Sequence, residues 1–148
     1  MRIATIAEIR AADAAEYPNA NWCEPMDAEY ALLTAMGYEL LLSEFHRSLR
    51  DRGLVYIAEK GDCDDFAWLF RAYLIERNWR SEHAAAPLAC RYGHYTDDRL
   101  GRHAIVFPTV VDATTGSLVT RALEPQPGSI GVRRLTRTER KTVTYLVG

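Results

Sequence analysis

The sequence predicts an α+β fold in which N-terminal helices pack on an antiparallel β-sheet. Apolar residues recur at helical spacing up to Asn78, and β-rich runs separated by turn signals follow from Pro87 onward. The chain has 148 residues, of which 48% are hydrophobic and 26% are charged. These values are typical of a globular protein, so we expect one domain over residues 1–148.

The helical part contains two segments, and the second has the more regular apolar spacing. Residues 27–52 follow a mostly helical pattern, with Gly37 as a break and an end near Gly53. The second helix is predicted from Asp62 to about Asn78, because its apolar residues fall at i, i+3, i+4, i+7 and i+8: Phe66, Leu69, Phe70, Tyr73 and Leu74. The same spacing places Cys63 on the apolar face, in the first turn.

The remaining chain reads as strands. Residues 87–95 form one predicted strand, and residues 103–111 and 117–124 form a hairpin around the turn sequence DATTG. Residues 142–147 are expected to close the sheet. Residues 2–9 are predicted to be a short strand or helix, and residues 17–27 a loop rich in Pro and Asn.

Charge and cysteine content exclude several classes. The formal net charge is −2, which does not favour nucleic acid as a partner, although acids outnumber bases in residues 1–65 and bases outnumber acids afterwards. Cys23, Cys63 and Cys90 are odd in number and widely spaced, so a disulfide scaffold is not expected. We find no signal peptide or membrane-spanning run, and therefore predict a soluble, cytoplasmic protein without a membrane partner. No feature indicates an oligomeric state.

Cys63 is the strongest candidate for a reactive residue. A thiol at a helix N-terminus faces unpaired backbone N–H groups, which favour the thiolate. Asp62, Asp64 and Asp65 surround it and act in the opposite direction, since like charges raise a thiol pKa. Helix capping explains one acid better than three, so a base or a cation is expected to offset them.

His103 is the candidate base. Folding the predicted hairpin brings His103 beside residues 124–126, where a carboxylate or amide would orient the imidazole. The register is uncertain by one residue, so Glu124 is preferred and Gln126 is the alternative orienting group or oxyanion donor.

These residues resemble a known family. The segment GDCDDFAWLFRAY at residues 61–73 is similar to the G-D-C-E-D-Y-A segment of bacterial transglutaminase-like cysteine proteinases. His103-Ala104-Ile105-Val106 resembles that family's His-Ala/Met-Val-Leu strand, and Leu123-Glu124-Pro125 stands where the family has Leu-Asp-Asn. The resemblance covers about residues 61–126 and implies a papain/transglutaminase-like fold, as a distant branch carried by a phage or mobile element.

The resemblance also implies residue roles. Cys63 would be the nucleophile, His103 the base and Glu124 the third member of a triad, in a cysteine peptidase or amidase acting on a protein or peptide substrate through a thioester. An amine replacing water would make the reaction a transglutamination. Family members that cleave surface adhesins carry calcium on the acids flanking the cysteine, which implicates Asp62, Asp64 and, as a further candidate, Asp65. No other cofactor is expected. The alternative is a non-catalytic binding or accessory module that retains the fold.

Weaker signals complete the prediction. Asn21 and Trp22, in the loop 17–27, are candidate oxyanion or site-wall residues. Cys90 and His94 lack the pairing of a zinc site, and a buried free thiol is the better interpretation of Cys90. The basic stretch at residues 133–141 is interpreted as a solvated face, and the alternative is a docking patch for an acidic partner or a nucleic-acid backbone.

Overall fold

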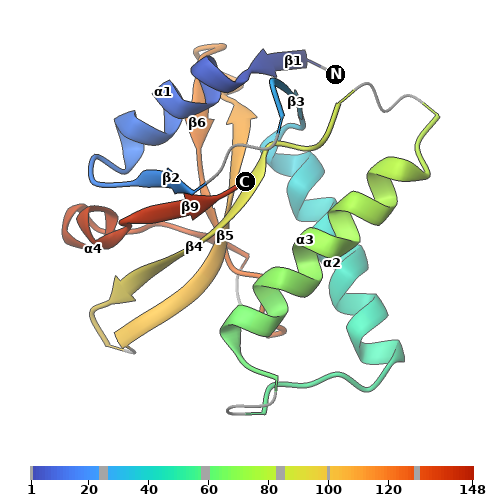
Figure 1. Ribbon diagram of the computed structural model, residues 1–148. Helices are drawn as coiled ribbons and strands as arrows, with labels where there is room; N and C mark the ends of the chain where they lie inside the picture. The colour runs from blue at the N-terminus through green and yellow to red at the C-terminus, as the bar shows by residue number, and fades with distance from the viewer. Residues whose placement is uncertain (1, 24–26, 58–60, 83–85, 100, 129–130) are drawn as a thin grey trace.

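The computed structural model describes residues 2–23, 27–57, 61–82, 86–99, 101–128 and 131–148. Strands and helices alternate along the N-terminal half, and strands dominate afterwards (Figure 1). The elements are β1 (Arg2–Thr5), α1 (Ile6–Glu16), β2 (Asn21–Cys23), β3 (Glu29–Leu32), α2 (Ala35–Asp51), α3 (Cys63–Trp79), β4 (Cys90–Asp97), β5 (Gly101–Val111), β6 (Leu118–Thr120), β7 (Ala122–Leu123), β8 (Val132–Arg133), α4 (Arg137–Thr142) and β9 (Tyr145–Val147).

The main sheet has the strand order β2-β9-β4-β5-β7-β8, with β6 also paired to β5. Strands β4 and β5 form its centre as a long antiparallel pair running from Cys90↔Pro108 to Asp97↔Gly101. Strand β2 joins β9 in parallel at the edge, and β1 pairs with β3 in a separate two-stranded sheet. The C-terminal strand β9 therefore lies between β2 and β4 in the main sheet, whereas the N-terminal strand β1 belongs to the smaller sheet.

Helices cover both faces of the sheet (Figure 1). Helices α2 and α3 pack on the face that carries Ala104 and Val106, and bury Phe45, Phe66 and Phe70 there. The opposite face buries a second cluster near α1 and α4, which includes Tyr17, Tyr95, Ile105, Phe107 and Leu146. Successive residues of β5 thus alternate between two cores, as the period of a strand requires.

A buried ion pair joins α1 to the sheet. The Arg91 guanidinium donates to Asp13, and its Nη2 lies 2.6 Å from Thr109 Oγ1 and 3.2 Å from Thr120 Oγ1. Arg91 is 0% exposed and Asp13 1%. Charges this deeply buried are tolerated only when they are paired and hydrogen-bonded.

Several predicted boundaries are wrong. Residues 29–32, expected to be helical, form β3, and α2 begins at Ala35 with Gly37 inside its first turn. Residues 2–9, expected to be a short strand or helix, contain β1 and the start of α1, which continues to Glu16. Residues 21–23, expected to lie in a loop, form β2. Residues 137–142 form α4, so the last strand begins only at Tyr145. The order of helices followed by an antiparallel meander is therefore incorrect, and the β2–β9 pair is parallel.

Gly93 lies where β4 is flanked by β5 and β9, and it carries the first mutational prediction. A Cβ at this position would lie 2.9 Å from the Tyr145 carbonyl oxygen and 3.0 Å from both Leu146 Cδ2 and Phe107 Cε2. Overpacking of this kind costs about 1–3 kcal/mol. We expect Gly93→Ala to lower the free energy of unfolding by that amount in urea denaturation, whereas Gly116→Ser, in an open turn with a φ of 71°, tests backbone strain without a clash. An unchanged urea midpoint for Gly93→Ala would contradict the packing described.

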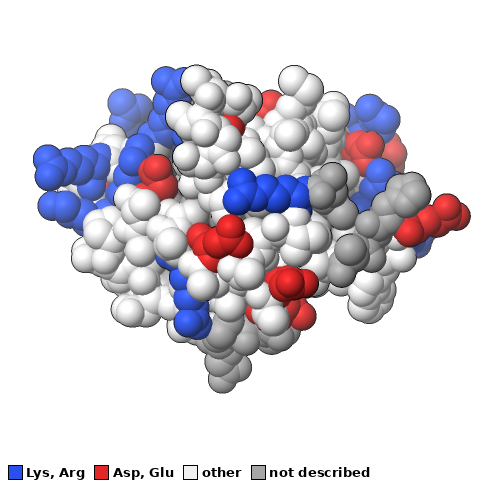
Figure 2. Space-filling model, turned by 90° about the horizontal axis from the view of Figure 1, so that it is seen from above, with Lys and Arg blue, Asp and Glu red and all other residues white. Residues whose placement is uncertain are grey.

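Charge is distributed unevenly over the surface. In Figure 2, Lys and Arg gather toward the side on which α1 and α4 lie in Figure 1. Two ion pairs involve bases of the C-terminal part of the chain: Arg140 pairs with Glu16 at 2.8 Å, and Arg133 pairs with Asp97 at 3.0 Å. Within the described ranges, none of the helices combines the length and the apolar character needed to cross a bilayer.

Candidate functional site

The first turn of α3 places Cys63 against the start of β5. Asp62 precedes the helix, its backbone N–H donates to Asp65 Oδ2 at 3.3 Å, and the Phe66 N–H returns to the Asp62 carbonyl at 3.1 Å. Strand β5 pairs with β7 only at Val106↔Leu123, so the stretch before Val106 has an open edge. Cys63 fills that edge, and its Sγ accepts a hydrogen bond from the Ala104 N–H at 3.5 Å.

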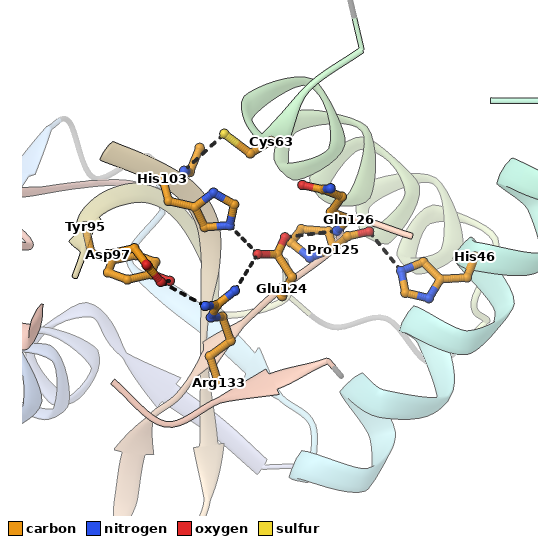
Figure 3. Close-up of polar contacts among 10 residues, drawn as sticks. His46, Cys63, Tyr95, Asp97, His103, Glu124, Pro125, Gln126 and Arg133 are labelled. Atoms are coloured by element: carbon orange, nitrogen blue, oxygen red, sulfur yellow. Dashed lines mark hydrogen bonds and ion pairs between the residues drawn. The ribbon is translucent and has the colours of Figure 1, made fainter. Parts of the chain in front are cut away.

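The structure brings His103 and Glu124 into direct contact. The imidazole Nε2 bonds Glu124 Oε2, and both side chains are buried, at 7% and 2% exposure. Because a carboxylate accepts, Nε2 carries the proton and Nδ1 is left as the accepting nitrogen. Figure 3 shows the imidazole between the Cys63 thiol and the Glu124 carboxylate. The ring is steadied by Tyr95, whose aromatic ring meets it edge-on at a centroid distance of 5.7 Å.

Arg133 holds Glu124 from the opposite side. Its Nη1 lies 3.4 Å from Glu124 Oε2, and its Nη2 lies 3.0 Å from Asp97 Oδ2 (Figure 3). The Tyr95 hydroxyl donates to the same Asp97 oxygen at 3.2 Å. The Arg133 guanidinium thus bridges two carboxylates and holds the Glu124 side chain in position beside His103.

The segment after β7 is fixed by backbone contacts. The Gln126 N–H donates to Glu124 Oε1 at 3.0 Å, and the Glu124 N–H donates to the Gly131 carbonyl at 2.7 Å. His46 of α2 bonds the Pro125 carbonyl through Nε2 at 2.8 Å, and the Gln126 side chain extends toward the end of α3 that carries Cys63 (Figure 3). Gln126 therefore contributes its backbone to orienting Glu124 and leaves its amide available.

The surroundings of Cys63 disfavour its thiolate. Burial raises the pKa of the thiol, the Ala104 N–H acts in the opposite direction, and the charges of Asp62, Asp64 and Glu124 raise the pKa further. A hydrogen bond to Asp62 is the main cause of a raised pKa at Asp64, with burial and the Asp62 charge adding to it. Without a compensating base or cation, this thiol is less reactive near neutral pH than a free one.

The acids around Cys63 form a compact group of potential ligands. One oxygen each of Asp62 and Asp64 and the Cys63 sulfur lie within 4.8 Å of one another. Asp65, the further candidate, is occupied by its contact with the Asp62 backbone. Two carboxylates suit a hard cation such as calcium, with the remaining oxygens to come from carbonyls and water.

The other predicted residues lie elsewhere. Asn21 and Trp22 are on the edge strand β2, where Asn21 pairs with Tyr145 and Trp22 with Leu146. The Trp22 ring packs between the guanidinium groups of Arg10 and Arg91, each 5.5 Å from its centroid. This places Trp22 over the buried ion pair instead of beside Cys63. Cys90 is a buried free thiol whose pKa is raised to about 11 by burial.

His46, Tyr95, Asp97 and Arg133 support the site and were not expected from the sequence. Arg133 belonged to the stretch interpreted as a solvated basic face, whereas pairing of β8 with β7 (Ala122↔Arg133) turns it toward Glu124. No local signal identifies such a contact.

Comparison with known proteins shows the fold. No protein-family model matches the chain, and no curated protein matches it. A solved structure described as a complex of PSL1a with E64 matches 99% of this chain and 50% of its own, with a TM-score of 0.69 and 19% identity. A Polyporus squamosus lectin bound to the human-type influenza-binding epitope Neu5Acα2-6Galβ1-4GlcNAc matches 99% of this chain and 49% of its own, with a TM-score of 0.70 and 19% identity.

These similarities correct the resemblance drawn from sequence. The lectin and PSL1a are among the solved structures that share this fold. On this ground the assignment to the transglutaminase-like cysteine proteinases is wrong. The papain/transglutaminase-like fold class and the names cysteine protease and thiol protease are wrong with it. A protein or peptide substrate loses its support for the same reason. The chain spans about half the length of these structures, and its fold is the one found in that half.

Proposed function

We propose that Cys63, His103 and Glu124 form a nucleophilic site that cleaves an activated acyl bond through a thioester. The observation that carries the proposal is the buried His103–Glu124 pair next to a thiol at the start of α3. The pair fixes the imidazole tautomer, so Nδ1 is the nitrogen that can take a proton from Cys63.

In the proposed reaction, His103 Nδ1 accepts the Cys63 proton and the sulfur attacks the acyl carbon. The carbonyl becomes an oxyanion, and the Cys63 backbone N–H and the Gln126 amide are the nearest candidate donors to it. Collapse breaks the bond to the leaving group, which takes the proton from His103. Water then attacks the thioester, His103 removes its proton, and the acid leaves with the thiol restored.

Among the described residues, the Cys63 sulfur is hydrogen-bonded to Ala104 and not to His103. The contact between a nucleophile and its general base is often long in a free enzyme and shortens when substrate binds. The proposal therefore requires the thiol and the imidazole to come into hydrogen-bonding contact when substrate binds.

Selective alkylation tests the proposal. Iodoacetamide at pH 7, followed by peptide mass spectrometry, compares Cys63 with the exposed Cys23 and the buried Cys90 in one sample. With about 5 mM calcium present, we expect Cys63 to react at least 10-fold faster than Cys23, because His103 and the bound ion would offset the burial and negative charge that raise the pKa of this thiol. Because PSL1a binds E64, an E64 adduct on Cys63 is a second expected result. Slower reaction at Cys63 than at Cys23 under all conditions would refute the assignment.

Calcium is part of this proposal. Asp62 and Asp64 would hold the ion, which would offset the negative charge that opposes thiolate formation at Cys63. Calcium is then expected to accelerate alkylation of Cys63, and to leave the rate at Cys23 unchanged.

Asp64→Asn tests the role of calcium, because it should change the alkylation rate of Cys63 in opposite directions without and with the ion. Without calcium, removing the charge lowers the Cys63 pKa, so the variant should be alkylated faster than the wild type at pH 7. At about 5 mM calcium, a site with the affinity of a calcium sensor is saturated in the wild type, whereas the site in the variant is impaired. The Cys63 thiol of the wild type should then be alkylated faster than that of the variant. Asp27→Asn, which changes an exposed acid beside the C-terminal half of α3, is the matched control. If Asp64→Asn were alkylated faster than the wild type both with and without calcium, Asp64 would hold no ion.

A carbohydrate-binding module is the second candidate. It is favoured by the lectin that shares the fold and is bound to a sialylated glycan, and by Trp79 of α3, which is 83% exposed and could stack on a sugar ring. Titration calorimetry with Neu5Acα2-6Galβ1-4GlcNAc tests it, with Trp79→Ala and Cys63→Ala compared. Binding at about 1 mM or tighter that Trp79→Ala removes and Cys63→Ala retains would favour the module; no heat at about 10 mM ligand would exclude that glycan.

A further inference from the structure

A small cavity opens beside the C-terminal half of α3, against β3 and the start of β4. Its volume is about 130 Å³, close to the ~150 Å³ of an apolar protein cavity known to hold benzene. The walls are largely apolar, and they include Leu74, Ile75 and Leu88. The exposed Trp79 also lines it. A space of this size and lining admits one ring or a short branched chain.

One cation lines this apolar space. Arg71 is half-buried, and within the described ranges it has no carboxylate partner, since its guanidinium lies 5.3 Å from the Trp68 ring instead. Burial lowers the pKa of Arg71, and the nearby Arg91 acts in the same direction. Arg91 is neutralised by Asp13, whereas Arg71 forms no ion pair with any carboxylate of the described residues. Gly148 also lines the cavity, on the side of Tyr30. Asp27 also lines the cavity, but it is exposed, so water screens its charge.

A second polar group lacks a partner at the same wall. Tyr30 is 3% exposed, lines the cavity, and its hydroxyl has no hydrogen bond among the residues that the structure describes. Leaving a buried hydroxyl unsatisfied costs about 1–3 kcal/mol, so a ligand oxygen here would remove an existing penalty. Cys90 completes the floor as a neutral thiol.

We propose that this cavity is a binding site for a small carboxylate with an apolar body. The carboxylate would pair with Arg71 and accept from the Tyr30 hydroxyl, while the body packs against Leu74 and Leu88. Arg presents two parallel donors to a carboxylate, which suits this head group better than a neutral amide. Arg71 is eight residues from Cys63 along α3, about 12 Å at the rise of a helix, so the site is distinct from the thiol.

Benzoate is the probe, because it fits the cavity and carries the required head group. Titration calorimetry or chemical-shift titration of the wild type should give a dissociation constant of about 1 mM or tighter, a modest value for a ligand of about nine heavy atoms. Benzamide, of the same shape without the charge, should bind at least 10-fold more weakly. This comparison uses the wild-type chain alone and does not depend on any variant folding.

Three variants localise the binding. Arg71→Met should weaken benzoate at least 10-fold, and Tyr30→Phe about threefold. Arg80→Met, on the same helix and in an exposed pair with Glu76, should stay within twofold. Equal affinity for benzoate and benzamide would overturn the proposal in favour of an apolar cavity without anion recognition. Absence of benzoate binding at about 20 mM, or unchanged affinity in a folded Arg71→Met, would show that the cavity holds only water.

Discussion

Asp13→Ala is expected to lower the free energy of unfolding by about 3–5 kcal/mol. The substitution leaves the fully buried Arg91 without its carboxylate, and breaking one partner of a buried ion pair has costs in this range. The Thr109 and Thr120 hydroxyls, 3.0 Å apart, cannot supply a countercharge. Because Asp13 lies on α1 and Arg91 on β4, we expect α1 to detach from the sheet first. Urea denaturation followed by circular dichroism measures the loss.

Two variants make this result interpretable. Glu76→Ala breaks an exposed i,i+4 pair with Arg80 and should change stability by no more than about 0.5 kcal/mol. Asp13→Leu combined with Arg91→Met replaces both charges with apolar groups and should recover much of the loss, since buried pairs often exchange for apolar contacts at little cost. A loss below about 1 kcal/mol for Asp13→Ala would mean that water reaches Arg91.

Local pattern was enough to predict α3 and the position of its cysteine. Phe66, Phe70 and Leu74 are buried as the helical spacing requires, and Cys63 stands in the first turn. The hairpin could also be predicted from the sequence. Strand β5 pairs with β6 around the turn at residues 112–116, and the chain after this turn brings Glu124 back to His103. Both features depend on residues close together in sequence, where period and turn chemistry act directly.

The errors occur where distant pairing overrides local preference. Residues 29–32 follow a helical pattern, but β1 pairs with them from Arg2↔Leu32 to Thr5↔Glu29 and holds them extended. Arg133 reaches Glu124 because β8 joins β7, a contact that charge counting cannot foresee. Two missed helices did carry a local signal, since Thr5 with Glu8 and Thr136 with Glu139 are capping boxes. A sequence motif shared around a cysteine likewise did not determine the fold, which is that of half of a lectin chain.

His103→Ala is expected to have the largest effect on function. If His103 is the base for Cys63, its loss should reduce the hydrolysis of p-nitrophenyl acetate by about 10²–10⁴-fold, the usual contribution of general base catalysis. The alkylation advantage of Cys63 over Cys23 at pH 7 should disappear with it. Stopped assays at pH 6–9 with calcium present measure both, and intact circular dichroism confirms that the variant folds.

The controls separate the base from its surroundings. Glu124→Gln keeps a hydrogen-bonding group beside His103 but removes its charge, so the imidazolium is less stabilised and an intermediate loss is expected. His94→Ala removes the histidine on the adjacent strand, whose Nε2 bonds the Tyr92 hydroxyl at 3.0 Å and whose Nδ1 bonds Tyr145. Because both of its nitrogens are occupied, His94→Ala should keep at least one third of the activity. If His94→Ala were the more damaging change, the base would be His94, and the His103–Glu124 pair would be a structural contact that joins β5 to the segment after β7.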